Sequence, residues 1–177
     1  MKVLTMLVTV IGLVILPVRY ERPAPVEVVP VTRIDPVDPV LQAMKVLAKT
    51  DKTTPEKLMA DPRKVAQIIV DQATAARVDP LLLTTIAWTE TRFRTNLKGD
   101  HGRSCGITQV RTDFKGRPTC EQLLDPAVAF AWTATHLNEI SDTGGKIQLD
   151  HYNAGKYEVR IWRTVDWLRR QLPVSQA

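Results

Sequence analysis

The sequence predicts a mainly α-helical domain behind an apolar N-terminal segment. Four times after residue 40, a residue that caps helices stands directly before a proline, which is typical of a helix start. Few runs alternate between apolar and polar residues as half-buried strands do. Helices are therefore expected to dominate residues 41–177. The start signals are Thr54–Pro55, Asp61–Pro62, Asp79–Pro80 and Asp125–Pro126, and they open predicted helices over 55–60, 62–78, 80–91 and 126–140.

A last amphipathic helix is expected over residues 156–172. Apolar side chains recur there near helical spacing, with charged residues between them. The apolar residues on this pattern are Val159, Trp162, Val165, Trp167 and Leu168.

The composition fits one globular domain with an appendage. The chain has 177 residues, 44% of them hydrophobic, which is enough for a core. It carries 24 Lys and Arg against 19 Asp and Glu, a net charge of +5, without a basic run. No basic stripe interleaves with aromatic residues in a recognisable nucleic-acid module, so nucleic acid is not expected as a partner. The charge favours mild attraction to anionic surfaces such as cell wall or lipid headgroups.

Residues 1–20 form an apolar segment of intermediate length. The uncharged run from Val3 to Val18 is short for a membrane span of ~17–25 residues and long for a signal-peptide core of ~7–15. No small-x-small cleavage site follows it. We predict an uncleaved signal anchor, with a cleaved signal peptide or a buried helix as the alternatives. The flanking charges do not fix its orientation.

Residues 21–40 are rich in proline. Proline removes backbone donors and holds the chain extended, so a stiff spacer is predicted before the domain at 41–177. The alternative is an edge strand over residues 26–31. The prolines are Pro23, Pro25, Pro30, Pro36 and Pro39.

Two cysteines, Cys105 and Cys120, flank a loop. They are too few for a disulfide scaffold, and their spacing fits no zinc motif. A domain outside the cytoplasm would allow a disulfide between them, and two buried thiols are the alternative.

Glu90 is the candidate catalytic residue, because it stands near the end of an otherwise uncharged apolar run. It lies on the same helical stripe as Leu83 and Ile86, so it is expected to point towards the interior. A carboxylate on such a stripe either pairs with a cation or takes up a proton at raised pH. A protonated glutamate near neutrality is a general acid. The alternative is a helix-end side chain that reaches solvent.

Three segments, "AWTETRF", "GDHGRSCGITQV" and "HYNAG", closely resemble the soluble lytic transglycosylase family of the lysozyme superfamily. The resemblance covers about residues 80–155, and it implies a lysozyme-like helical fold. The matching positions, in the family's order, are Glu90–Thr91, Gly106–Gln109, Leu124–Pro126 and Tyr152–Gly155.

The resemblance implies cleavage of the β-1,4 bond between N-acetylmuramic acid and N-acetylglucosamine in peptidoglycan. Glu90 would protonate the glycosidic oxygen and then accept the proton of the muramyl C6 hydroxyl, which closes onto C1 as a 1,6-anhydro product. The family needs neither a second carboxylate, unlike most glycosidases, nor a metal or other cofactor.

The resemblance also implies roles around Glu90. Tyr152 matches the family tyrosine that orients the catalytic acid. Gln109 would bind a sugar acetamido group, and Gly106 would let the backbone approach the saccharide. Thr91 keeps the hydroxyl of a family serine at the substrate site. Asn153 would either contact substrate or form the turn that presents Tyr152.

Asp100 leaves a second reaction open. Some members of the lysozyme superfamily carry an aspartate in this loop that activates water. A carboxylate ~6.5–9.5 Å from that of Glu90 would suit an inverting hydrolase, a muramidase. The alternative is a residue that only forms a turn. His101 beside it has no partner that suggests a metal site.

The expected partner is therefore peptidoglycan, with the membrane contacted through residues 1–20. The predicted location is the cell envelope, membrane-anchored with the catalytic domain in the periplasm, or a phage particle. Such enzymes accompany envelope-spanning secretion machines and phage entry. Two rival interpretations stay open: a non-catalytic peptidoglycan-binding module, and a helical assembly protein that works through its N-terminal segment.

Overall fold

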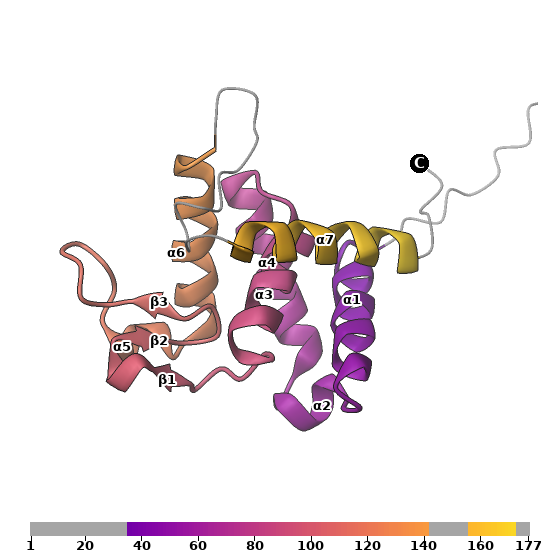
Figure 1. Ribbon diagram of the computed structural model, residues 1–177, viewed down its shortest axis with the longest axis horizontal. Helices are drawn as coiled ribbons and strands as arrows, with labels where there is room; N and C mark the ends of the chain where they lie inside the picture. Colours follow the sequence, from indigo (N-terminus) through magenta and orange to yellow (C-terminus); the bar gives the residue numbers. More distant parts are fainter. Residues whose placement is uncertain (1–34, 142–155, 173–177) are drawn as a thin grey trace, which may run out of the picture. The chain divides into compact units, whose positions relative to one another are not determined.

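Helices make up most of the computed structural model, which describes residues 35–141 and 156–172 (Figure 1). These residues belong to one compact unit, Arg33–Ala177. The prediction of a mainly helical domain is confirmed for them. The elements in chain order are α1 (Val37–Thr50), α2 (Pro55–Leu58), α3 (Pro62–Ala76), α4 (Pro80–Thr91), β1 (Lys98–Gly99), the 3₁₀ helix η1 (Asp100–Gly102), β2 (Ser104–Cys105), β3 (Val110–Arg111), α5 (Cys120–Leu123), α6 (Pro126–Glu139) and α7 (Lys156–Gln171).

The predicted helix starts are confirmed, and three have the expected cap. The side chains of Asp61, Asp79 and Asp125 each accept a hydrogen bond from a backbone N–H of the first turn. Thr54 precedes α2 without a side-chain cap. Proline follows each cap, where its missing N–H removes no helical hydrogen bond.

The start of α1 corrects the predicted boundary of the spacer. The helix begins at Val37, inside the segment 21–40 that was predicted to be extended. Asp35 Oδ1 accepts a hydrogen bond from the Val37 N–H at 3.0 Å, and Pro36 occupies the cap position. Proline is tolerated at the start of a helix, so Pro36 and Pro39 do not exclude this first turn. Arg63 on α3 then fixes the turn by ion pairs to Asp35 and Asp38.

The predicted signal anchor, residues 1–20, lies outside the described residues, and so does the spacer up to residue 34. The helices of residues 35–141 and 156–172 are all too short or too polar to span a bilayer.

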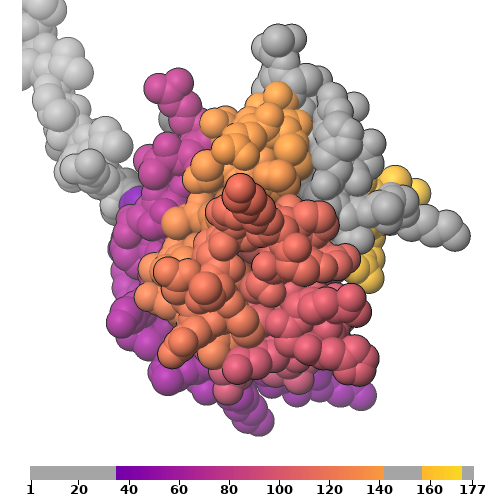
Figure 2. All heavy atoms as spheres, turned by 90° about the vertical axis from the view of Figure 1, so that its left-hand side faces the viewer, coloured from indigo at the N-terminus to yellow at the C-terminus, as the bar shows by residue number. Residues whose placement is uncertain are grey.

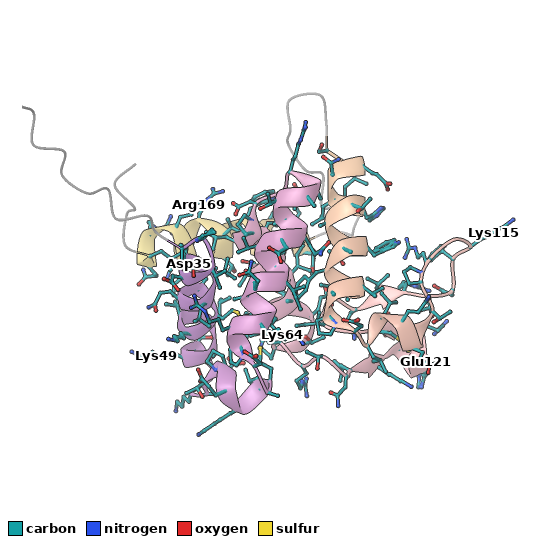
Figure 3. The ribbon with its side chains drawn as sticks, turned by 180° about the vertical axis from the view of Figure 1, so that it is seen from behind. Asp35, Lys49, Lys64, Lys115, Glu121 and Arg169 are labelled. Atoms are coloured by element: carbon teal, nitrogen blue, oxygen red, sulfur yellow. A yellow bond between two sulfur atoms is a disulfide. The ribbon has the colours of Figure 1, made fainter. Side chains whose placement is uncertain are left out.

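Helix α4 is the central element of the core. It packs against α1, α3, α6 and α7, and every residue from Leu82 to Trp88 is buried. Figure 1 shows α7 crossing over α4 and α1. Arg169 on α7, seen from behind in Figure 3, donates to Asp79 at the start of α4 at 2.6 Å. The C-terminal half of α7 therefore lies beside the N-terminus of α4.

A small antiparallel sheet, which was not predicted from the sequence, follows α4. Its order is β1-β2-β3, with Lys98 opposite Cys105 and Ser104 opposite Arg111. Each strand has two residues, too few for an alternating pattern to show in the sequence. Figure 2 looks onto the face that carries the strands, α5 and α6, from which the loop between β3 and α5 projects.

The hydroxyl of Thr85, inside α4, provides a test of the core. Thr85 is fully buried, and within the described part of the chain its Oγ1 has no hydrogen bond. Thr85→Val keeps the shape and removes an unsatisfied polar group, so we expect the free energy of unfolding to rise by about 1 kcal/mol. Chemical denaturation measures it.

The neighbouring Thr84 is the matched control. It is equally buried, but its Oγ1 donates to the carbonyl of Pro80 at 2.8 Å. Thr84→Val should therefore lower stability by about 1 kcal/mol. Equal losses for Thr84→Val and Thr85→Val would contradict the assignment of an unsatisfied hydroxyl.

Candidate functional site

The site is built around Glu90, on the last turn of α4. Leu83 and Ile86 on the same stripe are completely buried, and Glu90 is partly buried beyond them. The helix ends directly afterwards, because Arg92 and Phe93 adopt left-handed backbone conformations. Glu90 therefore lies at the edge of the apolar interior, partly buried beyond Leu83 and Ile86.

Tyr157 holds the Glu90 side chain. Its hydroxyl donates to Glu90 Oε1 at 2.6 Å across the contact between α4 and α7. Tyr157 is itself 8% exposed, so the hydrogen bond is largely shielded from water. Together with the Arg169–Asp79 contact, this bond places α7 antiparallel to α4.

Burial raises the pKa of the Glu90 carboxyl above its ordinary value. The hydrogen bond from Tyr157 and the positive charge of Arg160 act in the opposite direction, and the negative charge of Asp100 raises the pKa further. Because burial is the largest of these effects, Glu90 keeps its proton to higher pH than an exposed glutamate. That is the behaviour required of a general acid.

Tyr157 was not predicted from the sequence. Tyr152 and Asn153, the predicted orienting and substrate residues, lie outside the described residues. One signal was present, since Tyr157, Ile161 and Val165 recur at four-residue spacing and all three are buried. The predicted apolar face of this helix was partly wrong, because Val159 is 51% exposed.

Asp100 lies on the loop after α4, and its negative charge raises the pKa of Glu90. It begins η1, and its Oδ2 accepts a hydrogen bond from Ser104 Oγ at 2.7 Å. Asp100 and His101 both have positive φ, 49° and 57°, which is uncommon for residues other than glycine. The side chain of Asp100 is exposed, and the hydrogen bond from Ser104 holds it.

Thr91 lies inside the protein, although it was predicted to bind substrate. It is 1% exposed, and its Oγ1 lies 3.1 Å from the Ala87 carbonyl oxygen and 2.9 Å from that of Ile107. It therefore ties the end of α4 to the turn between β2 and β3, and has no surface to offer a ligand. Its contribution to the site is to hold that turn beside Glu90.

Gly106 was predicted to let the backbone approach a saccharide. In the structure its backbone lies close to α5 instead. Its φ is +77°, and a Cβ there would stand 2.0 Å from the carbonyl oxygen of Leu123. Glycine is thus required for the turn to pack on α5.

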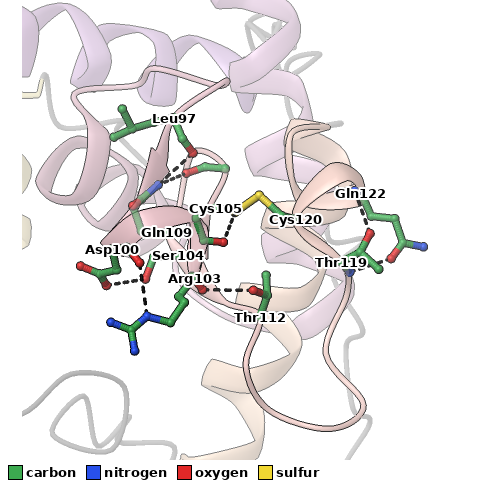
Figure 4. The surroundings of a disulfide bond; sticks show 12 residues. Leu97, Asp100, Arg103, Ser104, Cys105, Gln109, Thr112, Thr119, Cys120 and Gln122 are labelled. Carbon is green, nitrogen blue, oxygen red and sulfur yellow. Dashed lines mark hydrogen bonds between the residues drawn. A yellow bond between two sulfur atoms is a disulfide. The ribbon is translucent and has the colours of Figure 1, made fainter.

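Gln109 was predicted to bind a sugar, but its amide nitrogen is used within the protein. Nε2 donates to the carbonyls of Leu97 at 3.2 Å and Gly106 at 2.9 Å (Figure 4). Its Oε1 lies only 2.2 Å from where a Cβ would stand if Gly99 were replaced by a larger residue. The side chain therefore braces the loop that carries Asp100.

The structure joins Cys105 and Cys120 in a disulfide, one of the two states that the sequence left open (Figure 4). Cys105 belongs to β2 and is completely buried, and Cys120 begins α5. A capping box between Thr119 and Gln122 fixes that helix start. The disulfide therefore ties β2, which follows the turn at Asp100, to the start of α5.

Removal of the Tyr157 hydroxyl should shift the titration of Glu90. In Tyr157→Phe the packing is kept, but a hydrogen bond that lowers the pKa of Glu90 is lost. We expect the pKa of Glu90 to rise above its value in the parent protein. Carbon-13 NMR of the Glu90 carboxyl during a pH titration measures this, and an unchanged or lower midpoint would show that the bond does not stabilise the carboxylate.

No protein-family model matches the chain, and searches of curated proteins and of solved structures gave no match either. Within residues 35–141 and 156–172, no three His, Cys, Asp or Glu side chains gather as a metal site would require.

Proposed function

We propose that the chain is a peptidoglycan lytic transglycosylase with a lysozyme-like fold and Glu90 as its acid and base. The observation that carries the proposal is the partly buried Glu90 carboxyl, with its raised pKa and its hydrogen bond from Tyr157. The ordered resemblance of residues 80–155 to the soluble lytic transglycosylase family supports the same assignment.

In the proposed reaction Glu90 gives up one proton and later accepts one from the substrate. Glu90 donates the first proton to the glycosidic oxygen, and the bond from that oxygen to C1 of the muramyl sugar breaks. The C6 hydroxyl of the same sugar attacks C1 and returns its proton to the Glu90 carboxylate. The products are a 1,6-anhydromuramyl end and a free C4 hydroxyl on the N-acetylglucosamine, so no water is consumed.

Tyr157 takes the orienting role that the resemblance gave to Tyr152. It fixes Glu90 by Oε1, and among the described residues Oε2 accepts no hydrogen bond. Oε2 is therefore the oxygen assigned to carry the proton. An acid fixed by one oxygen loses little conformational freedom when substrate binds.

The test is the digestion of purified sacculi by the full-length protein, with mass spectrometry of the products. Muropeptides that end in 1,6-anhydro sugars support the transglycosylase. Reducing ends identify a hydrolase, and undigested sacculi contradict both enzymes.

A muramidase is the second candidate, because Asp100 raises the pKa of Glu90 and is held in place by Ser104. Such a carboxylate suits the activation of water in an inverting hydrolase. Asp100→Asn separates the two reactions: it should abolish release of reducing ends by a muramidase and leave most of the activity of a transglycosylase.

The proposed setting is the cell envelope or a phage particle, with residues 1–20 as the anchor. A disulfide persists in oxidising compartments, which supports a catalytic domain outside the cytoplasm. Because α1 begins at Val37, an informative deletion removes only residues 1–32. Digestion of sacculi by the truncated chain would argue against an assembly protein that works through its N-terminal segment.

A further inference from the structure

A pocket of about 300 Å³ lies between α1, α4 and α7, and residues of all three helices line it. Thr89, which precedes Glu90, and Arg160, one helical turn after Tyr157, both line it. Small-molecule sites usually enclose ~300–1,000 Å³. The pocket therefore suits a short branch of a substrate better than a whole polymer.

The pocket wall combines apolar surface with hydrogen-bond acceptors. The rings of Trp88 and Trp167 supply the apolar part. Thr50 Oγ1 donates to the carbonyl of Leu47 at 2.6 Å, and Thr164 Oγ1 donates to that of Arg160 at 2.9 Å. Because each hydroxyl proton is engaged, the two oxygens are left as acceptors for N–H groups.

The two arginines of the pocket differ in what they contact. Arg92 already pairs with Asp51 at 2.8 Å, donates to the Trp88 carbonyl at 2.7 Å and lies over the Trp88 ring. Arg160 has its guanidinium 5.7 Å from the centre of the Tyr157 ring. In the part of the chain that the structure describes, that guanidinium makes neither a hydrogen bond nor an ion pair from its side chain. It is the pocket cation available to an anionic ligand.

We propose that this pocket binds the peptide stem carried by the muramyl sugar. A short stem peptide offers carboxylates for Arg160, amide N–H groups for Thr50 and Thr164, and small apolar side chains for the tryptophans. This inference rests on the proposed function, because the stem hangs from the sugar whose C1–oxygen bond Glu90 would cleave. A stem site must therefore lie near Glu90, and Arg160 links the two, because it lines the pocket and its positive charge lowers the pKa of Glu90.

Binding of the stem would position the muramyl sugar on Glu90. Contacts made away from the reacting atoms hold the substrate in register, so a substrate without the stem loses reaction rate as well as affinity. The pocket would thereby favour natural, stem-bearing strands over bare glycan.

Calorimetry of the full-length protein in detergent micelles tests the binding. N-acetylmuramyl-L-alanyl-D-glutamate should bind about tenfold more tightly than N-acetylmuramic acid. Thr164→Phe, which fills the pocket, should remove that difference. Thr135→Phe places the same side chain on the exposed surface of α6, so it should keep the difference.

Equal affinity for the two ligands, or a difference that survives Thr164→Phe, would overturn the proposal. If Thr164→Phe lowers the melting temperature too far, Thr50→Phe closes the pocket from the exposed last turn of α1. These measurements need no catalysis, so they decide the pocket even if sacculi are not digested.

Kinetics test the consequence for catalysis. The ratio of kcat/KM on intact strands to kcat/KM on strands freed of stems by an amidase should be about ten in the parent. It should fall to about one in Thr164→Phe. A parent ratio of one, with Glu90-dependent digestion of both substrates, would contradict the stem site and leave the transglycosylase standing.

Discussion

Replacement of Glu90 by glutamine is expected to slow the digestion of sacculi by about 10²–10⁴-fold, the usual contribution of a general acid or base. A glutamine has no proton to give the glycosidic oxygen and cannot accept one from the C6 hydroxyl. Its Oε1 can still accept the hydrogen bond from Tyr157, so the geometry of the site should survive. Release of dye-labelled fragments from sacculi measures the rate, with circular dichroism as the check of the fold.

The matched control is Glu56→Gln. Glu56 is exposed in the first turn of α2, where backbone and side-chain hydrogen bonds lower its pKa. It stays ionised over the working range, so its replacement should leave the rate within twofold of the parent. If Glu90→Gln digests sacculi as fast as the parent, Glu90 is not catalytic and a peptidoglycan-binding module becomes the better interpretation.

The same assignment fixes the sign of the pH dependence. Glu90 must start the reaction protonated, so kcat/KM should fall as pH rises through its pKa. Burial raises that pKa, which moves the fall to higher pH than for an ordinary glutamate. In Tyr157→Phe the decrease in kcat/KM should occur at still higher pH, because the hydrogen bond that stabilises the Glu90 carboxylate is lost.

The helices could be predicted because their signals are local. A capping side chain and a proline stand next to each other, and they stabilise a helix start whatever packs on it later. For this reason α3, α4 and α6 begin where the sequence places them. The start of α1 was placed too late, because Pro36 and Pro39 favour an extended spacer as well as a first helical turn.

The site could be predicted only as far as one helix determines it. The apolar stripe on α4 indicated Glu90 and its direction without any knowledge of other elements. The partner Tyr157 depends on α7 packing antiparallel to α4, across a separation of 67 residues. The motifs that contain Thr91 and Gly106 do not reveal whether a residue faces a ligand or the interior. Here Thr91 is buried, and Gly106 packs closely on the Leu123 carbonyl inside the protein.

Loss of the disulfide between Cys105 and Cys120 is expected to lower the free energy of unfolding by about 3 kcal/mol. The cross-link closes a loop of 15 residues, and its removal returns that conformational freedom to the unfolded chain. Cys105 is completely buried, so the double replacement by alanine avoids placing an unsatisfied hydroxyl in the core. Differential scanning calorimetry should give a melting temperature about 10 °C below the parent.

Beyond this global effect, the segment around the site should gain a local opening that the helices do not. The disulfide joins β2 to α5, and β2 also carries Ser104, whose hydroxyl holds Asp100. The core helices α3 and α4 keep their contacts without it. Amide exchange should therefore quicken more in β2, β3 and α5 than in α3, where it reports only the global loss, because local opening needs only the contacts of the segment that opens. A reductant should reproduce this pattern in the parent and change nothing in the alanine variant. Equal loss of protection in α3 and β2 would show that the bond acts through global stability alone and does not hold the loop that carries Asp100.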